Sequence, residues 1–203
     1  MSEHTAYYQI GSGDVWGCAV DREQLLQIQS IWCCESCYRI RVPDVAIDVQ
    51  VEYRPEMKIN GPLNFIYFLG LVWKPFLDLF DPMAVQRDLR LGRVFGPDGS
   101  LYEDWLTFRG RCEVIVRGTK HVQYRICEKC GRVIYSAMGK RYLFPAPPCG
   151  AELFAAGGSR LVIPESAFAR LDLGKWRKKV YIERLPVPET PPDGLGLLTG
   201  TMT

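Results

Sequence analysis

Two pairs of cysteines place the strongest constraint on how this chain can fold. Cys34 and Cys37 form one Cys-x-x-Cys pair, and Cys127 and Cys130, followed by Gly131, form a second. Two intervening residues allow a tight turn that directs both sulfurs toward one point, and four thiolates complete the tetrahedral shell of a structural zinc ion. Gly131 suits the left-handed backbone position that closes such a turn. The sequence therefore predicts that zinc joins two segments whose last cysteines lie 93 residues apart (130 − 37).

Other uses of cysteine pairs fit this chain less well. Disulfide frameworks are typical of small secreted domains, whereas this chain has 203 residues and its start shows no secretory signal pattern. A redox Cys-x-x-Cys opens a helix, but each pair here lies between strand-like segments. A catalytic zinc needs an open coordination position, which four thiolates do not leave. Cys33 and Cys149 stay open as replacements for one of the four proposed ligands.

Composition and charge bound the class of protein. The hydrophobic content of 47% is sufficient for a substantial core, and the net charge of +2 argues against a protein that binds nucleic acid by bulk electrostatics. The charge is uneven, with 10 basic and 15 acidic side chains in residues 1–110 but 15 basic and 8 acidic in residues 111–203. The longest apolar stretch, residues 65–73, is half the length of a membrane span and predicts a buried strand. We expect a soluble, cytoplasmic protein that does not bind membranes.

The pattern along the chain predicts an α+β fold with a mostly antiparallel sheet and a few short helices. Residues 6–10 and the alternating residues 45–51 are typical of strands, and residues 96–99 (Gly-Pro-Asp-Gly) of a turn. Residues 111–116 and 122–126 flank a Gly-Thr-Lys turn, which predicts a hairpin that leads into the second cysteine pair.

An internal similarity predicts two related strand–helix–strand modules joined by a split zinc ribbon. Segments that begin at Pro82 and Pro164 share a proline, two leucines, a glycine and a following basic residue at an offset of 82 residues. Proline fits the first helical turn, Asp81 is a suitable N-cap, and Gly92 and Gly174 are predicted to end the two helices.

These features predict the organisation of the whole chain. We expect one compact domain at residues 1–187, made of two packed modules of about 1–110 and 111–187 that share the zinc site. Residues 188–203 are rich in proline and glycine, which predicts a flexible tail.

The sequence offers little support for catalysis. It has two histidines, His4 and His121, and neither a Gly-x-Ser-x-Gly elbow nor a phosphate-binding loop. Cys112 with His121 could form a nucleophile–base pair, but a buried thiol and an exposed histidine are the preferred interpretation. We do not expect an enzyme.

The order of these features resembles the double-CXXCG immunity proteins of bacterial polymorphic toxin systems, a group that includes the swarm-inhibition immunity proteins of myxobacteria. The similarity lies in the opening strand, the two cysteine pairs, and a closing module formed by Glu152–Phe154, Arg160–Ile163 and Val180–Val187. Tyr38 departs from the pattern, because it stands where the first pair would be followed by glycine.

The resemblance implies a cytoplasmic immunity (antitoxin) protein that binds and neutralises a cognate secreted toxin. The protein is expected to be a monomer alone and to bind its toxin one to one, with zinc in a structural role. Trp105, Trp176 and the basic residues 175–179 are candidates for an exposed binding patch. The alternative interpretation places both tryptophans in the core, with a solvated helix end beside them.

Two other functions stay open. The basic second half and the many aromatic residues could serve a zinc-ribbon protein that binds nucleic acid. Nucleic acid is nevertheless an unlikely partner, because Glu35 and Glu128 lie at the tips of the cysteine turns. The third possibility is a zinc-stabilised scaffold.

Overall fold

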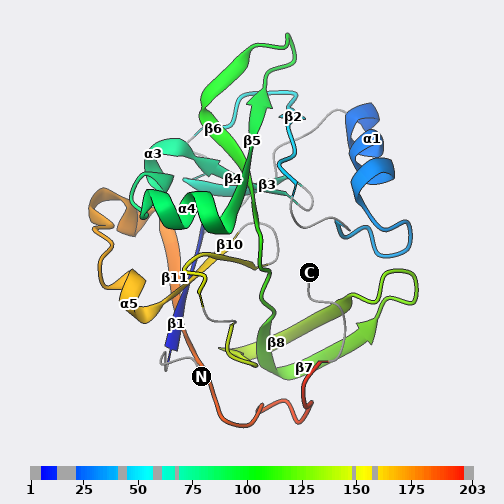
Figure 1. Ribbon diagram of the computed structural model, residues 1–203, viewed down its shortest axis with the longest axis vertical. Helices are drawn as coiled ribbons and strands as arrows, with labels where there is room; N and C mark the ends of the chain where they lie inside the picture. Colours follow the sequence, from blue (N-terminus) through cyan, green and yellow to red (C-terminus); the bar gives the residue numbers. More distant parts are fainter. Residues whose placement is uncertain are drawn as a thin grey trace.

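The computed structural model describes residues 6–12, 22–40, 45–56, 61–66, 69–147, 150–156 and 160–198. It confirms the predicted class, an α+β fold with mostly antiparallel strands and a few short helices (Figure 1). The strands are β1 Ala6–Ser12, β2 Val49–Gln50, β3 Leu63–Ile66, β4 Leu69–Trp73, β5 Leu89–Phe95, β6 Leu101–Gly110, β7 Val116–Ile126, β8 Val133–Leu143, β9 Phe154–Ala156, β10 Arg160–Pro164 and β11 Val180–Pro186. The helices are α1 Arg22–Trp32, α3 Lys74–Leu77, α4 Pro82–Asp88, α5 Glu165–Phe168 and the 3₁₀ helix η1 Gly174–Lys178.

The strands form two sheets and one separate hairpin. The first sheet has the order β2-β5-β6-β4-β3 and the second the order β11-β1-β10-β9, while β7 pairs with β8. Every pairing within these sheets is antiparallel except that of β2 with β5. In the second sheet β1, from the start of the chain, lies between β10 and β11, so the sheet of the second module is completed by the first strand of the protein.

The two sheets repeat one arrangement at an offset of 91 residues. β4 and β10 begin at Leu69 and Arg160, and β5 and β11 begin at Leu89 and Val180, so 160 − 69 and 180 − 89 give the same offset. The helices α3 and α5 begin the same distance apart (165 − 74). In each half a strand, a helical connection and a second strand therefore follow one another, and the two strands flank a third, which is β6 in one half and β1 in the other.

Local hydrogen bonds follow the same offset. Asp81 accepts a hydrogen bond at 3.0 Å from the backbone N–H of Met83, which caps α4 as predicted. Asp172, 91 residues later, accepts one at 3.0 Å from the N–H of Gly174. Both aspartates thus accept a hydrogen bond from the N–H two residues later, Asp81 as the N-cap of α4 and Asp172 one residue before the N-cap of η1.

The predicted offset of 82 residues is therefore wrong, although the two modules are related. Pro82 is the first residue of α4, whereas Pro164 is the last residue of β10. Gly92 does not end a helix but lies inside β5, where a Cβ atom would approach the carbonyl oxygen of Ile47 to 2.2 Å. The match failed because prolines, leucines and glycines recur at the ends of different elements.

The middle strands of the two sheets also occupy equivalent positions. β1 lies near the start of the chain and is the middle strand of the β11-β1-β10 group in the second sheet. β6 follows β5 in the chain and is the middle strand of the β5-β6-β4 group in the first sheet. The pairing register agrees residue by residue, with partners that differ by 91. The equivalent sets are Gln9 opposite Val162 and Glu183, and Thr107 opposite Leu71 and Gly92.

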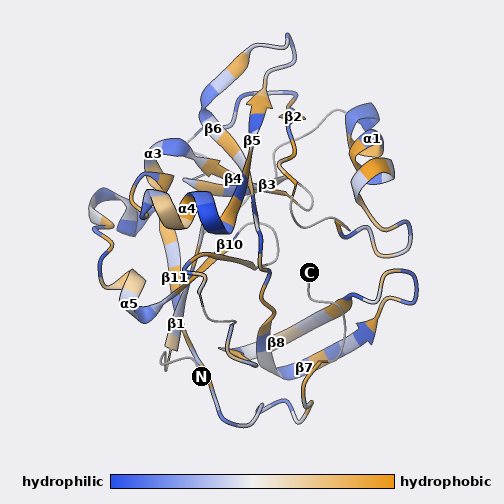
Figure 2. Cartoon of the chain, in the orientation of Figure 1, coloured by the Kyte–Doolittle hydropathy of each residue, from blue (hydrophilic) through white to orange (hydrophobic). Residues whose placement is uncertain are grey.

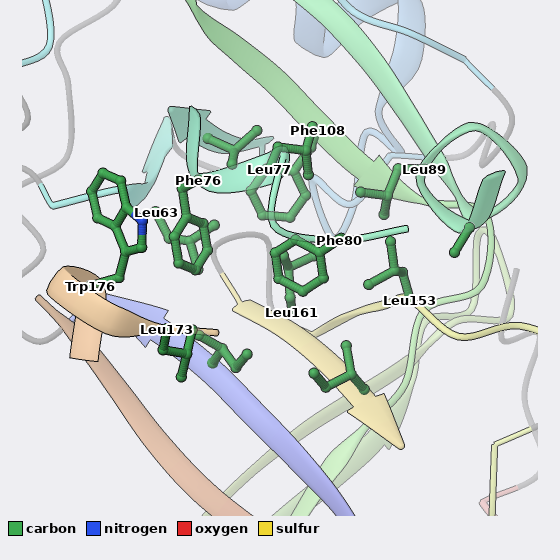
Figure 3. Close-up of a cluster of buried hydrophobic side chains, with 14 residues drawn as sticks. Leu63, Phe76, Leu77, Phe80, Leu89, Phe108, Leu153, Leu161, Leu173 and Trp176 are labelled. Atoms are coloured by element: carbon green, nitrogen blue, oxygen red, sulfur yellow. The ribbon is translucent and has the colours of Figure 1, made fainter. Parts of the chain in front are cut away.

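The largest hydrophobic cluster lies between the two sheets and takes side chains from both halves (Figure 3). Phe76 and Phe80, from the helical connection of the first half, face Leu161 of β10 and Trp176 of η1. The rings of Phe76 and Trp176 meet edge to face, with centroids 5.7 Å apart. Burial of these side chains is the main force that joins the halves.

Both tryptophans proposed for a binding patch belong to the core. Trp105 is 1% exposed and Trp176 is 4% exposed. The cations around Trp176 are exposed, as the alternative interpretation predicted: Lys175, Arg177, Lys178 and Lys179.

Three predicted strands differ from the structure. The apolar stretch 65–73 is the hairpin of β3 and β4 rather than one strand, and residues 67–68 lie outside the described residues. In place of the predicted hairpin over 111–126, residues 116–126 form the single long strand β7, in which the register shifts around Lys120 and His121 adopts a φ of 50°. Residues 111–115 precede it and form no named strand. Of residues 45–51, only Val49–Gln50 forms a named strand. The turn residues near 119 therefore make a bulge, and the second cysteine turn is itself the tip of the β7–β8 hairpin.

The end of the chain is anchored in the part that the structure describes, residues 188–198. The buried guanidinium of Arg117 donates to the carboxylate of Asp193, with Nε 2.7 Å from Oδ2. It also donates to the carbonyl oxygens of Leu195 at 2.6 Å and Gly196 at 3.0 Å. A buried guanidinium requires several acceptors, and the irregular backbone of residues 193–196 supplies them. The flexible tail at residues 188–203 stays a prediction.

Hydropathy follows the layers of the fold. Apolar residues dominate β3 and β4, whereas α1 and α4 mix hydrophilic and apolar residues (Figure 2). None of the helices in the described part of the chain has the length and apolar character needed to cross a lipid bilayer.

Candidate metal centre

The four predicted cysteines lie together at the junction of the two halves. The loop after α1 meets the tip of the β7–β8 hairpin (Figure 1), and the four Sγ atoms of Cys34, Cys37, Cys127 and Cys130 lie within 4.8 Å of one another. Cys34 Sγ is 3.8 Å from Cys127 Sγ, and Cys37 Sγ is 3.6 Å from Cys130 Sγ. Two thiolates bound at about 2.3 Å to one tetrahedral ion lie about 3.8 Å apart. The sulfur spacing therefore fits a single tetrahedral metal ion.

The two cysteine turns have the same backbone hydrogen bonds. In the first turn, Cys34 N–H donates to the carbonyl of Arg39 and Tyr38 N–H donates to the carbonyl of Cys34, each at 2.8 Å. In the second turn, Cys127 N–H donates to Arg132 at 2.8 Å and Gly131 N–H donates to Cys127 at 2.7 Å. Both turns therefore present their two sulfurs in the same way. Each close sulfur pair, Cys34 with Cys127 and Cys37 with Cys130, joins cysteines at equivalent positions of the two turns.

Tyr38 takes the backbone conformation that glycine takes in the second turn. Its φ is 55°, and that of Gly131 is 71°. The predicted left-handed conformation of Gly131 is confirmed. A tyrosine in this region costs about 1–2 kcal/mol relative to an ordinary conformation, but the turn closes all the same. Tyr38 therefore changes the energy of the first turn and not its geometry.

The thiols have opposed protonation preferences. Hydrogen bonds from backbone N–H groups of its own turn, Cys130 first, lower the pKa of Cys127 to about 6, and the same kind of donor lowers the pKa of Cys34. Burial raises the pKa of Cys37 to about 12 and also raises that of Cys130. Cys127 thus favours the thiolate without a cation, and a bound metal would stabilise the other three cysteines as thiolates as well.

Charged groups surround the centre without blocking it. Glu35 and Lys129, at the tips of the two turns, form an exposed ion pair with Oε1 and Nζ 2.9 Å apart. Such a surface pair contributes little to stability. Cys33, left open as a ligand, is buried and bridges to Ile40 outside the group of four sulfurs.

Other residues singled out in the sequence take no part in this centre. Cys112 is half-buried and packs against the cluster around Tyr7 and Phe154. His121 is exposed in β7. Cys149 and His4 lie outside the described residues. Sequence reasoning missed a basic cavity beside the centre, lined by Arg39, Arg132, Arg141 and Arg160. Two of these arginines follow the cysteine turns and two come from β8 and β10, and the sequence does not reveal that the fold brings them together.

Comparison with protein-family models and with curated proteins finds no match to this sequence.

Proposed function

We propose that this chain is a zinc-stapled immunity protein that binds and neutralises a cognate bacterial toxin in the cytoplasm. The observation that carries the proposal is the joining of two Cys-x-x-Cys turns into one centre of four sulfurs at the junction of the halves. Zinc is the metal that fits, because four thiolates in tetrahedral geometry are its preferred structural site. The ion would fix the two halves relative to each other and leave the outer surface free for a partner.

Exposed hydrophobic side chains next to the centre support a protein partner. Ile31 is 59% exposed, Tyr38 is 57% exposed and Ile126 is 42% exposed, and each lies within three residues of a proposed ligand. Exposed aromatic and aliphatic residues of this kind anchor protein interfaces when a partner buries them. The toxin-binding surface is therefore assigned to the region around the metal centre.

The test is recovery of the tagged protein from its native cell, with bound proteins identified and zinc counted in the same sample. One stoichiometric protein partner and about one zinc per chain is the expected result. An Ile126→Glu variant should keep its zinc and lose the partner, because the side chain is exposed. Arg177→Glu, in η1, is the matched control and should keep both.

Three results would count against the proposal. The nucleic-acid-binding alternative is favoured if nucleic acid is the main species recovered with the protein and its affinity falls steeply as the salt concentration rises. Zinc without any partner would leave only a scaffold. A protein without metal would remove the structural basis of the proposal.

A further inference from the structure

A cavity of about 260 Å³ lies between the second sheet and the β7–β8 hairpin. It is lined from one side by β1, β9 and β10 and from the other by β7 and β8. Four of its lining residues are arginines and one is an acid: Arg39, Arg132, Arg141, Arg160 and Glu113. The cavity is therefore strongly cationic, although the whole chain is nearly neutral.

Buried polar groups in this cavity lack partners. Gln9 is fully buried, and neither its amide oxygen nor its amide nitrogen has a hydrogen-bond partner in the described part of the chain. Arg132 is 7% exposed, and its Nη2 is likewise unpartnered, while its Nη1 lies 3.6 Å from Glu113. Buried polar groups without partners are rare because each costs about 1–3 kcal/mol. Their presence here indicates that something outside the chain completes them.

The equivalent place in the first half is filled by protein. Thr107, the counterpart of Gln9, donates to the carbonyl of Ile47 at 2.6 Å and accepts from the N–H of Gly92 at 3.1 Å. Ile47 can come this close because position 92 has no side chain, and a Cβ atom there would meet the Ile47 oxygen at 2.2 Å. The counterpart of Gly92 is Glu183, so the same approach is blocked in the second half, and space is left over Gln9.

A second difference between the halves supplies charge. Leu69 is 1% exposed and belongs to the hydrophobic cluster of the first half. Its counterpart is Arg160, a half-buried cation that forms no ion pair within the described residues. Arg141 is partly neutralised by Glu183 at 3.4 Å, and its charge adds to the burial that lowers the pKa of Arg160. An apolar packing site in one half is thus a polar, cationic cavity in the other.

We propose that this cavity binds a small oxyanion-bearing molecule, with a phosphate or carboxylate group on Arg132 and Arg160 and a hydrogen-bonding group on the amide of Gln9. Guanidinium forks match the oxygens of both anions, and the Gln9 amide offers one acceptor and one donor side. This site goes beyond the proposed toxin binding and does not depend on it.

Titration calorimetry on the full, zinc-loaded chain tests the site with three probes: inorganic phosphate, ribose 5-phosphate and succinate. We expect one site per chain, with at least one probe bound at submillimolar concentration. Arg160→Leu, which copies the first half, should weaken binding at least tenfold. Gln9→Thr should weaken binding of ribose 5-phosphate, whose hydroxyl groups can reach the amide, more than that of inorganic phosphate. Arg177→Gln, an exposed cation of η1, is the control and should bind like the wild type.

The outcomes identify which oxyanion the cavity binds and show whether the proposal fails. Binding of the phosphates alone, or of succinate alone, assigns the oxyanion. If Arg160→Leu does not fold, as shown by its urea unfolding curve, Arg160→Gln replaces it because it keeps a polar side chain at the same place. The proposal is overturned if no probe binds, or if a folded Arg160 variant binds as tightly as the wild type.

Discussion

Removal of one metal ligand should cost this protein a large share of its stability. A metal bound by all four cysteines joins Cys37 to Cys127, which closes a loop of 90 residues (127 − 37). By the loop-entropy relation for a covalent cross-link, closure of such a loop stabilises the fold by about 4–5 kcal/mol. Single domains are stable by about 5–15 kcal/mol in total. Cys127→Ser should therefore leave a protein that is only marginally folded.

Urea unfolding, followed by tryptophan fluorescence, measures this loss. With a denaturant slope of about 2.5 kcal/mol per molar, the midpoint of Cys127→Ser should fall by about 1.5–2 M. A chelator should bring the wild type to the same midpoint and leave the variant unchanged. Cys112→Ser, a half-buried cysteine outside the group of four, should keep its metal and a midpoint close to that of the wild type. A Cys127→Ser protein with one metal per chain and the wild-type midpoint would refute the reasoning.

Three further predictions test other parts of the fold. Gly92→Ala should lower the free energy of unfolding by about 1–3 kcal/mol because its Cβ meets backbone, whereas Gly196→Ala, which has open space, should change it little in the same urea experiment. Tyr38→Gly should raise the thermal midpoint, since it relieves a left-handed φ that costs tyrosine about 1–2 kcal/mol and that the freedom of glycine in the unfolded chain only partly offsets. Gly131→Ala should lower the midpoint, and equal effects of both changes would contradict the shared turn geometry. Burial alone would raise the pKa of Asp193, but hydrogen bonds from Arg117 outweigh it and the pKa is lowered. Its contribution is therefore present above the unfolded pKa of about 3.9 and lost as pH falls through the lower folded pKa. Asp193→Asn should then cost about 3–5 kcal/mol at pH 7 and clearly less at pH 3, and a constant difference across this range would exclude the role given to the ion pair.

The part of the site that could be predicted from sequence is the part that is local. Two residues between cysteines determine the turn, and Gly131 indicates its closing conformation, so the grouping of the four cysteines could be predicted from spacing alone. The helix α1 and the docking of Asp193 onto Arg117 were missed. In the second case the partners are 76 residues apart, and irregular backbone that satisfies a buried guanidinium has no periodic pattern.

The repeat shows a different limit of sequence reasoning. Its true offset of 91 residues pairs Val94 with Leu185, and Val72 with Ile163, which share apolar character and no identity. Packing at these positions requires only similar volume and hydrophobicity, not identical residues. The identical residues at an offset of 82 are prolines, leucines and glycines that commonly occur where helices and turns begin or end. The arrangement of strands, in which β1 and β6 hold equivalent places, could be recognised only from their pairing.

The placement of β1 and β6 accounts for where the two cysteine turns meet. Each of these strands precedes a cysteine turn in the chain: β1 comes before the turn at residues 34–37, and β6 comes before the turn at residues 127–130. β1 completes the second sheet although it lies at the start of the first half, whereas the first sheet is complete within residues 49–110. The chain leaves β1 of the second sheet to reach the first cysteine turn, and it leaves β6 of the first sheet to reach the hairpin that carries the second turn. Both cysteine turns are carried to the junction by these crossings. A metal ion bound by the four cysteines would join these two segments at equivalent points and hold the two halves in register. The halves then differ beside their middle strands, with a filled packing site beside β6 and a cationic cavity beside β1.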